Sequence, residues 1–265
     1  MHGRHDLPWR KTHDLYRILV SEVMLQQTQV DRVIPFYKSF IKQFPTARRL
    51  ATAPLREVLT SWQGLGYNRR AKMLHEAAKI IVKVGVPKDV EALEQLPGVG
   101  PYTARAVAVF AYNQDAVVIE TNIRTAIIHH FSANKSGQSL ALAKVSDEDI
   151  EKVLLRVLPK GLPASRQGRS REWYSALMDY GAHLKQQGIS HNARTKAYAK
   201  QSRFAGSLRE ARGAILRALA RGPRKRATLE NLLGVPRRLQ VQKALTALLA
   251  EGLICSYRGT FTLGA

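Results

Sequence analysis

The stretch LPGVGPYTARAVAVFA, residues 96–111, determines the fold, because it places two glycines two residues apart at the start of an amphipathic helix. Gly98 and Gly100 let the backbone approach a ligand closely, and the first N–H groups of the helix carry partial positive charge. The turn can therefore seat a phosphate. A Gly-x-Gly turn alone is a weak signal, and a glycine-rich connection between two helices is the alternative.

A second stretch, SEVMLQQTQV at residues 21–30, places an acid where a helix would carry an apolar side chain. At about 100° per residue, Glu22 falls in the middle of a stripe formed by Leu15, Ile18, Leu19 and Val23. A carboxylate that faces a core is costly unless it is paired, protonated or lines a cavity. We therefore expect Glu22 to be functional; the alternative is a carboxylate that binds a buried arginine or a backbone group.

The composition points to a polyanionic partner. The chain has 265 residues, is 45% hydrophobic and carries a formal net charge of +22. Such a surface gains affinity by releasing counterions from phosphates, so nucleic acid is the leading candidate. No apolar run reaches membrane-spanning length and the segment MHGRHDLPWR lacks a signal-peptide core, so we expect no membrane partner and a cytoplasmic location. The single cysteine, Cys255, excludes an internal disulfide and a Cys-ligated metal site.

Up to about residue 184 the pattern is helical and interrupted by Gly and Pro, which predicts an all-α body. The run AVVIETNI, residues 116–123, favours a buried connection into a helix over a strand. Residues 185–226 hold twelve Lys/Arg and one acid, Glu210. This predicts a linker followed by a basic helix; a solvated charged face is the alternative, but Tyr198 and Phe204 favour a segment that tracks DNA.

The C-terminal pattern changes again. It predicts helices at residues 208–222, 228–234 and 239–252, with a turn at VPRR, and then a β-hairpin that turns at Arg258 and Gly259. Three helices followed by a hairpin resemble a winged helix-turn-helix domain. Such domains commonly bind DNA through the helix after the turn, here from Arg237 onward, with the hairpin as a wing, but they also bind proteins.

Five motifs, in order, resemble the helix-hairpin-helix DNA glycosylase superfamily and, within it, the adenine DNA glycosylases: LPWR, SEVMLQQTQV, WQGLGYNRRA, LPGVGPYTA and ETNIR. The resemblance covers about residues 6–184. It implies a mainly α protein with a two-lobed helix-hairpin-helix glycosylase body at residues 1–184. A basic linker at 185–206 and a winged-helix-like α+β domain at 207–265 complete the predicted organisation.

The resemblance implies that Glu22 protonates the purine of a flipped adenine, for which desolvation should keep the acid neutral near pH 7. A second carboxylate is expected beneath the cationic sugar. Counting eighteen residues from Tyr102, as the superfamily pattern requires, gives Glu120 where relatives have aspartate. Asp115 is the fallback, and Asn122 is expected to support the carboxylate or contact the DNA backbone.

Tyr102 stands where bifunctional relatives such as endonuclease III carry a lysine that forms a Schiff base. A phenol cannot form that imine. The sequence therefore predicts a monofunctional glycosylase that leaves the abasic site uncleaved. Tyr102 would instead shield the cationic sugar or pack on the pocket wall.

The remaining predicted site residues contact DNA. Gln26, Gln27 and Thr28 are expected to line the base pocket or to fill the gap left by the extruded nucleotide. Tyr67 is expected to wedge beside the opposite base, or else to pack the turn. The predicted backbone contacts are Gly98, Gly100, Thr103, Arg69, Arg70 and Lys72.

The sequence also departs from its relatives, which typically carry four cysteines that hold an iron–sulfur cluster. We predict that the cluster is absent, that no other cofactor is bound, and that His183 and His191 are surface residues rather than metal ligands. The relatives' C-terminal domain, which senses 8-oxoguanine, is replaced by the winged-helix-like segment. The predicted substrate is double-stranded DNA with adenine opposite G or 8-oxoguanine, bound by a prokaryotic, nucleoid-associated monomer. Action on uracil, thymine or another damaged base, or a DNA-binding protein without catalysis, are the alternatives.

Overall fold

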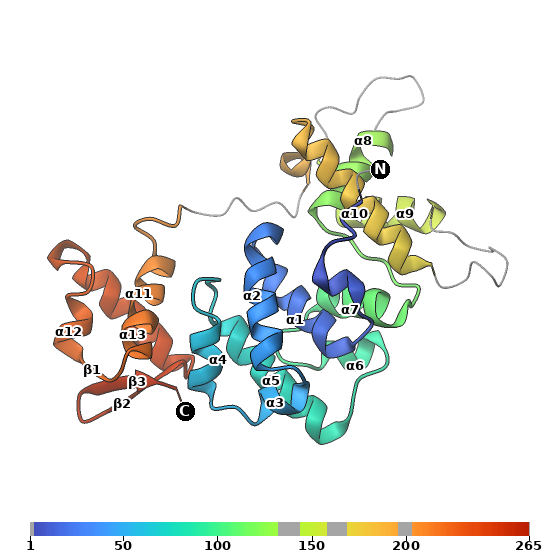
Figure 1. The fold of residues 1–265 in the computed structure, drawn as a ribbon. Helices are drawn as coiled ribbons and strands as arrows, with labels where there is room; N and C mark the ends of the chain where they lie inside the picture. Colours follow the sequence, from blue (N-terminus) through green and yellow to red (C-terminus); the bar gives the residue numbers. More distant parts are fainter. Residues whose placement is uncertain (1–2, 132–143, 158–168, 196–202, 265) are drawn as a thin grey trace. The chain divides into compact units, whose positions relative to one another are not determined.

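The computed structural model describes residues 3–131, 144–157, 169–195 and 203–264, and it is mainly helical (Figure 1). Tyr198 of the predicted basic segment lies outside the described residues. The chain forms two compact units: residues 1–18, 88–91 and 100–200 make the first, and residues 19–87, 92–99 and 201–265 make the second. None of the helices in the described ranges is long and apolar enough to cross a membrane.

Where the structure describes the first unit, its regular elements are helices, and one isolated bridge pairs Val145 with Thr195. The residues of two helices, α1 (Leu15–Leu25) and α6 (Val90–Glu94), are divided between the two units. The helices that lie within the first unit are η1 (Pro8–Lys11), α7 (Pro101–Tyr112), α8 (Thr121–Phe131), α9 (Asp147–Val157), α10 (Ser170–Gln186) and η2 (Asn192–Arg194).

The core of this unit lies between α7, α8, α9 and α10, where Val109, Ile127, Leu154 and Tyr174 are buried. The connection of residues 113–120 contains no strand, as the sequence predicts. Its Val118 is fully buried, and the Val118 N–H donates to the Tyr174 hydroxyl at 3.2 Å instead of to a neighbouring strand. The connection therefore places residue 120 at the start of α8.

Helix α10 packs against α8 at a glycine. A Cβ atom on Gly181 would overlap the main-chain carbonyl of Asn122, so this crossing requires the absence of a side chain. The close approach brings the C-terminal turns of α10 next to the first turn of α8.

The second unit contains, before residue 88, the helices α2 (Val30–Gln43), α3 (Ala47–Ala51), α4 (Leu55–Ser61) and α5 (Arg69–Val84). The Phe40 ring packs at a tilt against Phe44 and edge-on against Trp62, with ring centroids 4.9 and 5.7 Å apart. All three rings are buried, and they form the centre of this core.

The C-terminal part of the second unit folds as the predicted three helices and hairpin. Its elements are α11 (Leu208–Ala220), β1 (Arg224–Lys225), α12 (Arg226–Glu230), η3 (Val235–Arg237), α13 (Arg238–Ala250), β2 (Ile254–Tyr257) and β3 (Thr260–Leu263). The hairpin turns at Arg258 and Gly259, both with positive φ (46° and 74°), which confirms the predicted turn.

Two details of this part differ from the sequence prediction. The strands form an antiparallel sheet in the order β1-β3-β2, and the two-residue strand β1 was not predicted. The short helix begins at Arg226 and ends at Glu230, not at residues 228–234. An ion pair between Arg226 and Glu230, one turn apart, stabilises this earlier helix.

Candidate functional site

In the second unit, Glu22 lies on the inward face of α1, as the helical periodicity predicts. Its side chain is buried, with 7% of the residue exposed, between Ser21 and Val23, which are also buried. Gln26 directly follows α1, and its main-chain N–H donates to the Glu22 carbonyl at 3.3 Å. The acid and the first glutamine of SEVMLQQTQV therefore lie one turn apart at the end of α1.

Arg70 holds the C-terminal end of α1. Its Nη1 atom donates to the carbonyls of Val23, Met24 and Gln26 at 2.7, 2.9 and 2.6 Å, and its Nη2 atom donates to the Thr28 hydroxyl at 3.2 Å. The last carbonyls of a helix lack partners within the helix and carry partial negative charge, which a guanidinium compensates. Burial lowers the pKa of Arg70 to about 10, so it stays cationic at neutral pH.

The prediction that Arg70 contacts a DNA phosphate is therefore wrong. The residue is 8% exposed, and its guanidinium is used inside the protein. A signal was present in the sequence, because Arg70 falls on the same face of α5 as the buried Leu74 and Ile81. Its neighbour Arg69 is exposed.

A cavity of about 430 Å³ lies beside this end of α1. Its lining residues are Gln26, Gln27, Tyr67, Asn68, Arg69, Arg70, Met73, Arg209, Arg212 and Glu251. Gln27 and Tyr67 both have positive φ, 56° and 48°, which costs free energy in residues other than glycine and is common at binding sites.

Tyr67 contacts two arginine side chains, Arg70 and Arg209, that the sequence did not predict to lie near each other. The guanidinium carbons of Arg70 and Arg209 are each 5.3 Å from the Tyr67 ring centroid. Arg209 also donates from Nη1 to the Tyr67 hydroxyl at 2.9 Å. Arg209 lies on α11, 142 residues further along the chain, so no local pattern predicts this contact.

Lys72, also predicted to contact DNA, donates to the main-chain carbonyl of Glu251 at 2.6 Å. The Glu251 carboxylate binds both Nη atoms of Arg212, at 2.8 and 2.6 Å. Arg212 accordingly lowers the pKa of Glu251.

The glycine turn directly precedes α7. Gly98 and Gly100 are exposed, while Val99 between them is buried. Gly98 has φ of 78°, and a Cβ atom there would lie 2.8 Å from Cβ of Met73. Gly100 caps α7, and a Cβ atom there would meet nothing within 4 Å.

Thr103 was predicted to contact the DNA backbone, and this is wrong for its side chain. The residue is 3% exposed. It precedes Ala106 and Val107 by three and four residues, so it falls on the buried stripe of α7.

In the first unit, Glu120 caps α8. Its Oε1 atom accepts the main-chain N–H groups of Asn122 and Ile123 at 2.7 and 2.8 Å. Its Oε2 atom accepts the hydroxyl of Thr121 at 3.1 Å. The longer side chain of glutamate thus folds back onto its own helix, where the dipole favours a negative charge.

Three charged or polar residues surround this carboxylate. Lys185 donates from Nζ to the side-chain oxygen of Asn122 at 2.6 Å, so Asn122 supports Glu120 through its main-chain N–H while its side chain holds the lysine. Burial lowers the pKa of Lys185, partly opposed by Glu120. A bidentate bond to Asp147 raises the pKa of Arg124, and Glu120 and Tyr102 add to that effect.

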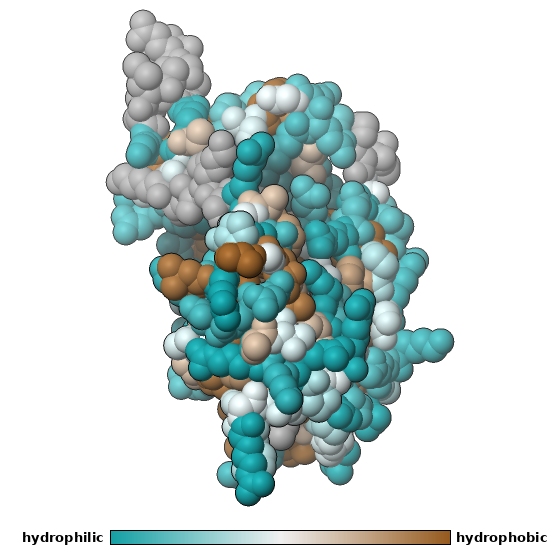
Figure 2. All heavy atoms as spheres, turned by 90° about the vertical axis from the view of Figure 1, so that its left-hand side faces the viewer, coloured by the Kyte–Doolittle hydropathy of each residue, from teal (hydrophilic) through white to brown (hydrophobic). Residues whose placement is uncertain are grey.

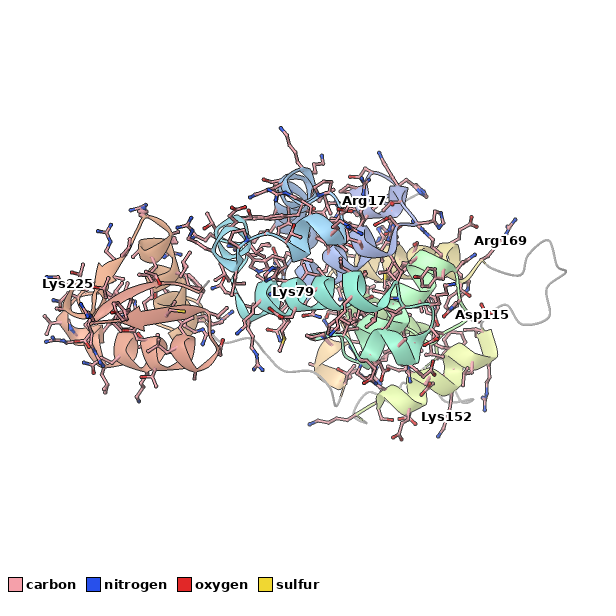
Figure 3. All side chains as sticks on the ribbon, turned by 90° about the horizontal axis from the view of Figure 1, so that it is seen from below. Arg17, Lys79, Asp115, Lys152, Arg169 and Lys225 are labelled. Carbon is pink, nitrogen blue, oxygen red and sulfur yellow. The ribbon has the colours of Figure 1, made fainter. Side chains whose placement is uncertain are left out.

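The shared role of Tyr102 and Glu120 stays a prediction, although both side chains act electrostatically on Arg124. Tyr102 is 36% exposed on the first turn of α7. The position of Lys185 beside Asn122 was not predicted, because it depends on the crossing of α10 over α8. Asp115, the fallback carboxylate, is exposed and accepts the Ser170 hydroxyl (labelled in Figure 3).

The residues of the chain do not fit an iron–sulfur cluster. Such clusters need several thiolates, and the chain has one cysteine, Cys255, which is exposed on β2. Within the described ranges, no three His, Cys, Asp or Glu side chains are grouped to hold a metal ion. His191 instead stacks on His129, with Nε2 and Nδ1 3.5 Å apart.

The sequence of this site matches a known family. The model of the HhH-GPD superfamily base excision DNA repair proteins matches residues 20–156. The chain belongs to the HhH-GPD superfamily. It is therefore a DNA glycosylase of base excision repair, and its substrate is DNA.

Curated relatives of this HhH-GPD protein extend the similarity to most of the chain. An adenine DNA glycosylase of Mycolicibacterium smegmatis is 38% identical over 96% of this chain and 89% of that protein. Adenine DNA glycosylases of Mycobacterium tuberculosis and Homo sapiens are 48% and 43% identical over 47% and 45% of this chain. These stretches span 42% and 24% of those two relatives.

A solved structure supports the fold. A thermostable thymine-DNA glycosylase superposes on 68% of this chain and 79% of its own, with a TM-score of 0.56 and 27% sequence identity. The predicted fold class and family of the HhH-GPD protein are thereby confirmed.

Proposed function

We propose that this HhH-GPD protein is an adenine DNA glycosylase that removes adenine mispaired with G or 8-oxoguanine and leaves the abasic site uncleaved. The similarity to the Mycolicibacterium smegmatis adenine DNA glycosylase supports the choice of adenine, since it covers 96% of this chain. The proposal includes action as a cytoplasmic monomer. It also includes the absence of an iron–sulfur cluster, because Cys255 is the single cysteine that the chain could offer as a thiolate ligand.

The observation that carries the proposal is the buried acid on α1. Glu22 is 7% exposed, on the helix whose end Arg70 holds beside the Gln26–Gln27 cavity. Desolvation favours the neutral, proton-donating form of a carboxyl group. Glu22 donates its proton to the adenine ring, so that the base departs neutral when the N9–C1′ bond breaks.

In this proposal Glu120 stabilises the positive charge that develops on the sugar. Departure of adenine leaves positive charge on C1′ and the ring oxygen, which a nearby carboxylate stabilises. Water then adds to C1′ and its proton restores Glu22. The N–H groups of Asn122 and Ile123 hold Glu120 in place.

Tyr102 supports a hydrolytic rather than an imine-forming reaction, since a phenol cannot form a Schiff base with the abasic sugar. Borohydride trapping tests this part. We expect no covalent protein–DNA product. If one forms, Lys185→Met identifies whether the amine beside Glu120 is responsible, and the monofunctional assignment is withdrawn.

The decisive experiment is a panel of labelled duplexes that carry a single A·G, A·8-oxoguanine, A·C, T·G or U·G pair. Each is incubated with excess enzyme and then cleaved with alkali at abasic sites. We expect cleavage at adenine. Glu22→Gln should lower the single-turnover rate at least about 100-fold, the usual contribution of a general acid, with little change in DNA affinity. Glu148→Gln, an exposed acid on α9, is the control.

A second candidate has one specific observation in its favour. The superposed solved structure is described as a thymine-DNA glycosylase. Cleavage of T·G or U·G without cleavage of adenine would replace the first proposal with this one. No cleavage of any duplex, with DNA affinity intact, would indicate a binding protein without catalysis.

A further inference from the structure

The acidic residues of the C-terminal domain, residues 207–265, are all used in ion pairs. The domain contains eleven Lys/Arg and three acids. Arg212 binds Glu251 at 2.6 Å and Arg237 binds Glu210 at 2.8 Å. The third, Glu230, binds Arg226 at 2.8 Å and Arg238 at 3.1 Å.

The cations left without an acidic partner in this domain include a group at one end of its sheet. Lys225 and Tyr257 are both paired with Thr260, so these three residues form a row across β1, β3 and β2. Lys225 is exposed at the end of the sheet (Figure 3). Arg258 follows at the hairpin turn, and its guanidinium carbon lies 5.2 Å from the Tyr257 ring centroid. Tyr257 is 73% exposed.

Helix α13, where a winged helix-turn-helix domain usually contacts DNA, is less suited to that role here. Arg237 and Arg238, at its start, are held by Glu210 and Glu230. Two exposed side chains nearby are apolar, Val235 at 76% and Leu239 at 64%. Figure 2, which views the left-hand side of Figure 1, shows apolar patches among hydrophilic side chains. Within α13, Lys243 is the exposed cation that lacks an acidic partner.

We propose that the sheet end formed by Arg224, Lys225, Tyr257 and Arg258, here called the wing patch, binds the phosphate backbone of duplex DNA outside the lesion. Cations with an exposed aromatic side chain at a protruding hairpin suit a backbone contact that does not read sequence. The inference rests on the proposed function only in that both require DNA binding. It assigns no part of the wing patch to catalysis.

The test measures the salt dependence of duplex affinity for the full chain, by fluorescence anisotropy with an undamaged 30-base-pair duplex at 50–200 mM KCl. Each phosphate contact contributes about 0.9 to the slope of log affinity against log salt. Lys225→Gln with Arg258→Gln should therefore flatten the slope by about 2. The control, Arg217→Gln with Lys243→Gln, removes the same charge from α11 and α13 and should change the slope much less.

Two further measurements make the result decisive. Tyr257→Ser should weaken binding at every salt concentration without changing the slope. Thermal unfolding of each variant should match the wild type, since all the altered side chains are exposed. Equal slopes for patch and control variants overturn the inference, and a larger effect of the control places DNA on the helices instead. A flattened slope in a chain that cleaves no duplex would support the wing patch and refute the proposed function.

Discussion

Arg70 donates to the main-chain carbonyl of Gln26 at 2.6 Å, so the first turn of α5 holds the last turn of α1. Gln26 and Gln27 follow directly on the helix that carries Glu22, and they line the cavity beside it. The positions of the predicted site residues Glu22, Gln26 and Gln27 thus depend on Arg70, which was itself predicted to bind DNA.

Replacement of Arg70 should therefore affect the fold before it affects DNA binding. Arg70→Ala removes the guanidinium donor from the carbonyls of Val23, Met24 and Gln26, and we expect a loss of about 3 kcal/mol or more in the free energy of unfolding. Urea titration measures it. Arg69→Ala, its exposed neighbour, should leave stability unchanged and lower the salt slope of DNA binding by about 0.9. If Arg70→Ala instead lowers the salt slope and leaves stability unchanged, Arg70 contacts DNA.

Glu120 combines a proposed catalytic charge with a helix cap, and two substitutions separate these roles. Glu120→Gln keeps an oxygen acceptor for the N–H groups of Asn122 and Ile123, whereas Glu120→Ala removes it. We expect both to lose glycosylase activity, but only Glu120→Ala to lose about 1 kcal/mol of stability. Single-turnover cleavage and thermal unfolding, measured on both variants, check this. Full activity in Glu120→Gln would exclude a catalytic charge at this position.

Lys185 should make stability depend on pH in the alkaline range. Burial lowers its pKa below the ordinary value of 10.5, so between the lowered pKa and pH 10.5 the unfolded chain binds more protons than the folded chain. The free energy of unfolding contributed by this group therefore rises with pH in that window. Lys185→Met should lose this rise, while Lys152→Met, on the exposed face of α9 (Figure 3), should keep it. Urea titrations from pH 7 to 10 provide the comparison.

The contact between Arg209 and Tyr67 should be measurable as a coupling energy. Arg209→Met and Tyr67→Phe each remove the same 2.9 Å hydrogen bond, so together they should cost less than the sum of the single substitutions. We expect a coupling of about 1 kcal/mol in the free energy of unfolding. Arg217→Met, two turns further along α11, is the control and should show no coupling to Tyr67→Phe. Additive effects of Arg209→Met and Tyr67→Phe would show that the bond does not form in solution.

The features that the sequence predicted correctly are those that local patterns determine. The inward position of Glu22 follows from helical periodicity, and the hairpin follows from two adjacent turn residues, Arg258 and Gly259. Arg209 and Lys185 were missed because contacts between helices distant in sequence create their surroundings. Strand β1 was missed because two residues carry no periodic signal, and its pairing with β3 is non-local.

Thr103 is a different kind of error, because the family motif outweighed the periodicity. The motif grouped it with the glycines at the DNA surface, while its spacing from Ala106 and Val107 already placed it on the buried face of α7. The same spacing argument applied to Arg70 and Leu74 on α5. In both cases the residue is of a type that commonly contacts phosphate, but it is buried in the protein.

The two glycines of the opening motif allow the backbone contact to be tested apart from the fold. Gly98→Ala should cost at least about 2 kcal/mol, because φ is 78° and the new Cβ would lie 2.8 Å from Met73 Cβ. Gly100→Ala meets no atom within 4 Å and should cost well under about 1 kcal/mol. If DNA approaches this turn closely, Gly100→Ala nevertheless weakens duplex affinity, because its methyl group lies between the backbone and the phosphate. Anisotropy at constant salt measures that loss, and unchanged affinity in the stable Gly100→Ala variant would move the phosphate away from the turn.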